Sequence, residues 1–216
     1  MRIAALALAA AVAACNPSAP SGQAGNEGGG LFPDLTAAAY RAEATISHTD
    51  GSSMPIVMIR DGGKMRMEIN AAEGQSTLIA NAETGESYIL SNAGGQAVAI
   101  RASGMGDQFS NPTEEWQGEL SRDATRTGSC NVAGETGAEW TKTTEADGTD
   151  TVCVTNDGII LRATDDGRVV WETTRVQRGA QNAALFTVPE GVQVMDLGNV
   201  GAMMNQAMER AKNADR

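Results

Sequence analysis

Side chains that could catalyse a reaction are scarce in this sequence. His48 is the only histidine among 216 residues, so a nucleophilic serine or cysteine would have to use it as its general base. Ser47 and Asp50 lie too close to His48 in sequence to form an ordinary triad with it on a strand. Because Thr49, Asp50 and Gly51 are typical turn residues, we expect a solvent-exposed histidine and no enzyme activity.

Methionine offers a second kind of chemistry, since the chain has ten of them. Thioethers can bind Cu(I) in an oxidising compartment, but they also fill cores and adaptable apolar grooves. Core packing is the first expectation, an apolar cleft the second and copper the third. No other metal and no cofactor is predicted, because no Asp/Gly-rich segment supplies the regular oxygen ligands of a calcium loop. The methionines that fall on candidate strands or a candidate helix are Met54, Met58, Met65, Met67, Met203, Met204 and Met208.

The first residues have the pattern of a secretory signal peptide. A basic start at Arg2 precedes an apolar run that ends in Val12-Ala13-Ala14, directly before Cys15. The run is shorter than the roughly 20 residues that span a bilayer. Val-Ala-Ala-Cys resembles the lipobox of bacterial lipoproteins. This resemblance implies that residues 1–14 are removed and that Cys15 carries the acyl chains, palmitate among them, that anchor the protein.

The lipobox also implies a location in the cell envelope. Asn16 follows Cys15 where an aspartate retains lipoproteins in the inner membrane of enteric bacteria, so the periplasmic face of the outer membrane is favoured. Residues 16–30 are rich in Gly, Ser and Pro and are typical of a flexible tether. We therefore divide the chain into a signal peptide (1–14), a lipidated cysteine and tether (15–34), a folded domain (35–196) and a C-terminal helix (197–216).

The remaining cysteines, Cys130 and Cys153, are left as a pair if Cys15 carries lipid. In an oxidising compartment such a pair is expected to form a structural disulfide. A redox-active or metal-binding pair is the alternative, although the spacing is not Cys-x-x-Cys and no histidine lies nearby in sequence.

The charge of the chain restricts its partners. Without Arg2, 15 basic residues face 27 acidic ones, a balance of −12. Nucleic acids and anionic lipid surfaces require clusters of Lys and Arg, so neither is an expected partner. Attachment to the membrane is expected through the N-terminal lipid alone.

Most of the domain alternates between short apolar-polar runs and turn residues. The clearest run is Lys64–Asn70, in which Met65, Met67 and Ile69 share one face. Short links such as Asp61-Gly62-Gly63 make consecutive strands antiparallel neighbours, and a sheet of some ten strands curls. The other candidate strands are Tyr40–Ile46, Pro55–Ile59, Thr77–Ala80, Ser87–Leu90, Ala97–Arg101, Glu139–Thr143, Thr151–Thr155, Ile159–Ala163, Val169–Val176 and Ala184–Val188.

Two segments read as helices. Asn111 and Pro112, followed by acidic residues, predict a helix that runs to about Leu120 and carries Trp116. At the C-terminus an apolar stripe that includes Met204 and Met208 predicts an amphipathic helix of roughly Asn199–Asn213. We predict a mainly β (α+β) fold: one antiparallel, strongly curved sheet, a half-barrel, with a helical lid and a C-terminal helix.

Four stretches in order resemble the LolA/LolB superfamily of exported half-barrel proteins, and in particular its uncharacterised members. They are Gly63–Glu68, Ser76–Tyr88, Cys130–Glu135 and Leu185–Gly191. The resemblance implies a curved sheet with helices against its concave side, which supports the same fold.

Three hypotheses for function follow. The first is an apolar cleft for an acyl chain or lipid, covered by one of the helices. Its lining is predicted from Tyr40, Ile46, Met65, Met67, Ile69, Tyr88, Trp171, Met204 and Met208. The second is a structural lipoprotein with a filled core that docks a protein partner through the C-terminal helix. The third is Cu(I) binding by methionines.

Overall fold

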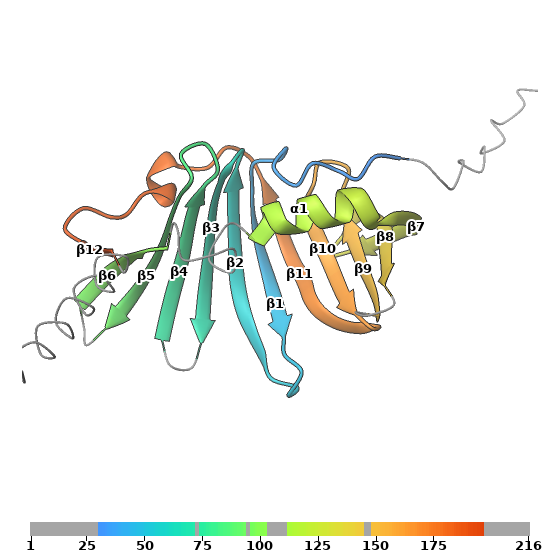
Figure 1. Cartoon of the computed structure of the whole chain (residues 1–216), viewed down its shortest axis with the longest axis horizontal. Helices are drawn as coiled ribbons and strands as arrows, with labels where there is room; N and C mark the ends of the chain where they lie inside the picture. Colours follow the sequence, from blue (N-terminus) through green and yellow to red (C-terminus); the bar gives the residue numbers. More distant parts are fainter. Residues whose placement is uncertain (1–29, 72–73, 94–95, 103–111, 145–147, 197–216) are drawn as a thin grey trace, which may run out of the picture.

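One curved sheet organises the computed structural model, which describes residues 30–71, 74–93, 96–102, 112–144 and 148–196 (Figure 1). Neighbouring strands follow the order β12-β6-β5-β4-β3-β2-β1-β11-β10-β9-β8-β7. The strands are β1 (Tyr40–Ser47), β2 (Ser53–Asp61), β3 (Lys64–Ala71), β4 (Gly74–Asn81), β5 (Glu86–Ala93), β6 (Gln96–Arg101), β7 (Thr125–Val132), β8 (Glu135–Thr144), β9 (Gly148–Val154), β10 (Ile160–Asp165), β11 (Arg168–Arg178) and β12 (Gln193–Asp196).

The first half of the sheet is a run of hairpins that starts at its centre. Strands β1 to β6 pair successively and antiparallel, and the described link between β2 and β3 contains Gly62, whose φ is 60°. The chain then continues into helix α1 (Pro112–Asp123), which lies across strands β8 to β11 in Figure 1. The second half returns from β7 at one edge to β11, which pairs with β1.

The face that carries α1 is called the inner face here. Register places Tyr40, Ala42 and Ala44 of β1 on it, and their cross-strand partners include Met58 and Ile56 of β2. On one side of β1 these rows of cross-strand partners continue through β2 to Met67 of β3. On the other side of β1 they continue to residues of β11. The side chains named here on β1, β2 and β3 are apolar and buried, so the core lies between the inner face and α1.

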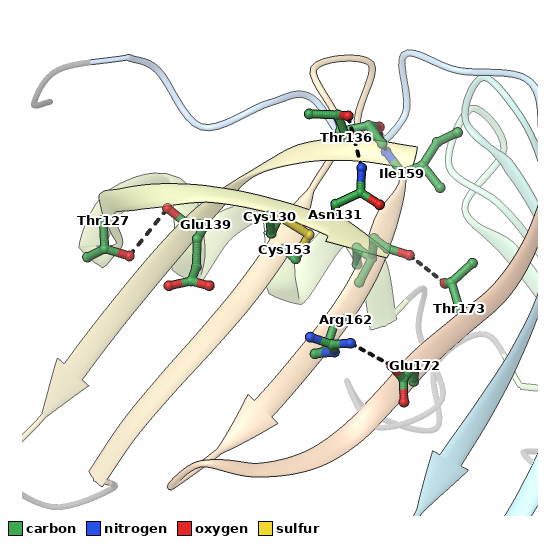
Figure 2. Close-up of a disulfide and its surroundings, with 12 residues drawn as sticks. Thr127, Cys130, Asn131, Thr136, Glu139, Cys153, Ile159, Arg162, Glu172 and Thr173 are labelled. Carbon is green, nitrogen blue, oxygen red and sulfur yellow. Dashed lines mark hydrogen bonds and ion pairs between the residues drawn. A yellow bond between two sulfur atoms is a disulfide. The ribbon is translucent and has the colours of Figure 1, made fainter. Parts of the chain in front are cut away.

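The edge strand β7 folds back over the outer face of its neighbours, where it contacts β9 and β11 (Figure 2). Gly137 of β8 permits this bend, because a Cβ there would lie 2.5 Å from the carbonyl oxygen of Val154. A disulfide joins Cys130 of β7 to Cys153 of β9 across β8, with a Cα–Cα distance of 6.0 Å. The predicted disulfide is therefore confirmed, and it fixes the folded-back edge.

A segment before β1, called the strap and comprising residues 30–39, ties the sheet to the helix. Leu35 is fully buried, and its backbone N–H donates to Oε1 of Gln117 on α1 at 2.7 Å. Its carbonyl accepts from Nη1 of the buried Arg60 at 2.9 Å. Phe32 packs edge-on against Trp140, with ring centroids 5.3 Å apart. These contacts place α1 over the second half of the sheet.

The structure confirms the predicted half-barrel class and corrects some of its details. The predicted strand Ala184–Val188 is wrong, because Ala183–Phe186 forms a 3₁₀ helix, η2, whose first turn is capped by the side chain of Asn182. Strand β7 was not predicted. The sheet is also not wholly antiparallel, because β12 pairs parallel to β6.

The signal peptide, Cys15 and the C-terminal helix lie outside the described residues. Of the helices that the structure does describe, none has the length and apolar character needed to cross a bilayer.

Candidate apolar pocket beneath helix α1

A hollow of about 330 Å³ lies where the centre of the inner face meets α1, and it is called the apolar pocket here. Strands from both halves of the sheet and the helix contribute to it. Among the described residues, none of the lining side chains carries a charge at neutral pH. They are Tyr40, Ile46, Met58, Met67, Trp116, Ile160, Val170 and Trp171.

Two tryptophans close one side of the pocket. Trp116 of α1 stands edge-on to Trp171 of β11, with ring centroids 6.2 Å apart. The indole N–H of Trp171 donates to Oγ1 of the buried Thr173 at 3.1 Å, and that hydroxyl donates to the Ile160 carbonyl at 2.8 Å. These hydrogen bonds hold the Trp171 ring in one orientation. Trp116 belongs to α1, so a movement of the helix moves this side chain of the pocket wall.

Two polar contacts hold α1 at its place above the sheet. Gln117 accepts the hydrogen bond from the strap, and Nζ of Lys142 on β8 lies 3.0 Å from Oε2 of Glu119. The hydrogen bond that Lys142 donates to Glu119 raises the pKa of Lys142, with further contributions from the charges of Asp123 and Asp150. Between these contacts Trp116 and Leu120, one helical turn apart, pack against the core. The Lys142–Glu119 ion pair can break at modest cost, since the Glu119 side chain is 46% exposed.

Tyr40 lies in the pocket wall, next to a buried cation. Tyr40 is the register partner of Arg60 on β2, whose side chain is fully buried. Burial raises the pKa of Tyr40 to about 12, an effect that the charge of Arg60 opposes. The phenol is therefore neutral at physiological pH.

A second hollow of about 220 Å³ adjoins the apolar pocket and is called the charged vestibule here. The two hollows share Trp116 and Val170 in their walls. The vestibule lies under the C-terminal half of α1, and its remaining wall comes from the ends of β8, β9 and β10. It is lined by Glu119, Leu120, Lys142, Asp150, Thr151, Val152, Ala163, Thr164 and Asp165 in addition to the two shared residues.

Four of the residues predicted for the cleft line the apolar pocket: Tyr40, Ile46, Met67 and Trp171. Met65 and Ile69 share the inner face but lie outside its lining, and Met65 is fully buried. Met204 and Met208 lie outside the described residues.

The prediction for Tyr88 is wrong, because its side chain lies on the outer face. Tyr88 pairs with Ile79, which is one residue out of phase with Leu78, the partner of Met67. There Tyr88 lines a separate hollow of about 280 Å³ beside Phe186 of η2. Its ring lies 5.0 Å from the guanidinium of Arg101, which is paired with Glu86.

Four pocket residues escaped the predicted lining, and one of them, Trp116, lies on a helix that was expected only to cover the cleft. Met58 is the register partner of Met67, so pairing the two strands in sequence would have found it. Val170 lies at a bulge between β10 and β11, where the register shifts, and simple alternation fails there. Ile160 begins β10, which has a second register shift against β9.

The structure also places the residues considered for catalytic and metal chemistry. His48 is exposed in the turn between β1 and β2, as expected, where its backbone N–H bonds to the Ser52 carbonyl. Within the described ranges no three His, Cys, Asp or Glu residues cluster as a metal site would require. Met58 and Met67 contribute their thioethers to the pocket wall.

No family model matches the sequence, and no curated protein matches it. Among solved structures, an uncharacterised conserved protein from Thermus thermophilus is similar at 11% identity and a TM-score of 0.52, over 74% of this chain and 91% of that one. The MucA/MucB complex of Pseudomonas aeruginosa matches at 14% identity and a TM-score of 0.49, over 74% of this chain and 59% of that one. PNGF-II matches at 16% identity and a TM-score of 0.46, over 74% of this chain and 31% of that one. The Thermus match shows a shared fold and carries no information on activity.

Proposed function

We propose that this protein binds an apolar ligand, an acyl chain or a comparable alkyl group, in the apolar pocket. The observation that carries the proposal is the hollow of about 330 Å³ beneath a helix, whose described lining consists of eight uncharged side chains. Its volume falls at the lower end of the range of about 300–1,000 Å³ for small-molecule sites. Burial of alkyl surface there supplies the driving force, about 25 cal/mol per Å².

The contacts of α1 support its role as a lid. Only the partly exposed Lys142–Glu119 pair and the Gln117 hydrogen bond are polar ties between the helix and its surroundings in the contacts described. Movement of Trp116 away from Trp171 opens a path into the pocket without breaking any strand pairing. The methionines in the wall adapt to ligands of different shape because their side chains are flexible.

The cellular setting belongs to the same proposal. We infer an envelope lipoprotein of LolA/LolB-like architecture, anchored through Cys15 and facing the periplasm. The signal sequence and lipobox support this inference, and so does the disulfide, which is typical of oxidising compartments. Labelling with a palmitate analogue, compared between the wild type and Cys15→Ser, tests the anchor.

The ligand proposal is tested by filling the pocket. The probe is N-phenyl-1-naphthylamine, a neutral dye whose fluorescence rises in apolar surroundings. Ile46→Trp places a large ring in the pocket, whereas Thr45→Trp adds the same ring to the same strand on the outer face. We expect the dye to bind the wild type and Thr45→Trp and to lose at least tenfold in affinity for Ile46→Trp. Equal binding by all three proteins, or no binding by the wild type, would overturn the proposal.

A further inference from the structure

Leu35 of the strap contacts the sheet and the lid helix at the same time. Its backbone N–H donates to Oε1 of Gln117 on α1 at 2.7 Å, and its carbonyl accepts from Nη1 of Arg60 on β2 at 2.9 Å. The Leu35 side chain is also fully buried. Withdrawal of the strap breaks both hydrogen bonds and exposes apolar surface, so the docked position is favoured.

The sheet leaves a close-fitting space for the strap beside Leu35. The carbonyl oxygen of Asp34 lies so near Gly158, in the turn between β9 and β10, that a Cβ at position 158 would overlap with it. Nearer the N-terminus, Phe32 packs against Trp140 of β8. The strap is therefore seated on the second half of the sheet at several points, and the Gln117 hydrogen bond joins it to α1.

Gln117 connects the strap to the apolar pocket. It directly follows Trp116, whose ring forms the pocket wall together with Trp171. The hydrogen bond from Leu35 thus holds the helical turn that carries Trp116 in its place over the pocket. Among the residues described, the pocket lining includes none from the strap, so the strap can control entry without touching the ligand.

We propose that the strap is a gate for the apolar pocket. Docked on the sheet, it holds α1 over the pocket, and its release lets Trp116 move away from Trp171 and admits the ligand. This inference rests on the proposed function, because it assigns control of access to the pocket beneath α1.

A gate of this kind has a kinetic signature. The docked strap closes the empty pocket and the occupied pocket alike, so weakening it raises the rates of ligand association and dissociation together. The dissociation constant changes little, since the ligand contacts the same side chains once the strap has docked again. Damage to the pocket wall would instead raise the dissociation constant.

Two nearly isosteric variants of Gln117 test the gate. Gln117→Leu removes the acceptor of the Leu35 N–H, whereas Gln117→Glu keeps an acceptor oxygen at the same place. Rates are measured with N-phenyl-1-naphthylamine by stopped-flow mixing and displacement. Both rates should rise about fivefold in Gln117→Leu, the factor that one such hydrogen bond contributes to an equilibrium. Gln117→Glu should show rates no higher than those of the wild type, and all three dissociation constants should be similar.

A second pair of variants displaces the strap from the sheet. Gly158→Ala places a Cβ against the Asp34 carbonyl, which forces the strap to shift. Gly51→Ala is the control, because its φ of 82° is close to the 86° of Gly158 but nothing lies within 4 Å. Both rates should rise in Gly158→Ala and stay at the wild-type level in Gly51→Ala.

The outcomes separate the gate from the proposed function. Wild-type rates in Gln117→Leu would overturn the gate and leave the proposed function intact. Faster rates in Gly158→Ala alone would also overturn it, because they would assign the effect to the turn before Ile160 of the pocket wall. If the dye does not bind the wild type, the proposed function itself fails.

Discussion

Lengthening the alkyl chain of the ligand is a direct probe of the apolar pocket. The described residues of the pocket wall include no charged side chain, so each additional methylene exchanges water for apolar contacts. Burial of one methylene contributes about 0.8 kcal/mol, which corresponds to about fourfold in affinity. From hexanoyl to decanoyl glycerol, four methylenes should contribute about 3 kcal/mol and tighten binding about 200-fold.

The size of the pocket sets a limit to this gain. A hollow of about 330 Å³ is small for a ligand site, so the increments should diminish for dodecanoyl and longer chains. Displacement of N-phenyl-1-naphthylamine by each monoacylglycerol, below its critical micelle concentration, gives the affinities. Ile46→Trp serves as the filled-pocket control, in which the increments should largely disappear.

Two results would refute this reasoning. An affinity that does not change with chain length would mean that the chain is not buried. An undiminished series of increments in Ile46→Trp would mean that the chain is buried elsewhere, for example in the hollow beside Tyr88 on the outer face.

Three further predictions concern the fold that holds the pocket. Removing the disulfide by Cys130→Ala/Cys153→Ala should lower the free energy of unfolding by about 3 kcal/mol, because the bond closes a loop with a sequence separation of 23. Unfolding in guanidinium measures this change. An unchanged midpoint of the unfolding transition would contradict the role of the disulfide in fixing β7. Gly137→Ala should cost about 2 kcal/mol or more in the same assay because its Cβ has no room, whereas Gly128→Ala, which has nothing within 4 Å, should cost little. Because the folded-state pKa of Tyr40 is raised to about 12 from 10.0, its contribution to stability is present below pH 10 and is lost as the pH rises through 12. Tyr40→Phe should therefore weaken the alkaline loss of stability by up to about 3 kcal/mol, and an unchanged pH profile would contradict the burial of a neutral phenol.

Hairpins with alternating sequence could be predicted from the sequence because their two faces differ in polarity. Lys64–Asn70 lies wholly within β3, and the inward placement of Met67 follows from it. The sequence of β7, TRTGSCNV, shows no such alternation, because this edge strand is largely exposed and is fixed by a disulfide and a bend at Gly137. Its existence depends on tertiary contacts that a local pattern does not contain.

The remaining errors have similar causes. Tyr88 was assigned to the cleft as an aromatic residue, without the register that pairs it with Ile79. Ala184–Val188 has the apolar character of a strand, but Asn182 caps a 3₁₀ turn there and Phe186 is buried against the outer face. The sequence analysis did not single out Arg60, and its burial becomes apparent only through its pairing with Tyr40.

The most direct measurement of the central claim is which methionine methyl groups touch the bound chain. Protein with ¹³C-labelled methionine methyl groups and bound monodecanoylglycerol should show intermolecular nuclear Overhauser effects to Met58 and Met67, which line the pocket. Met195, on the exposed strand β12, should show none. Contacts to Met195 without contacts to Met58 and Met67 would contradict binding beneath α1.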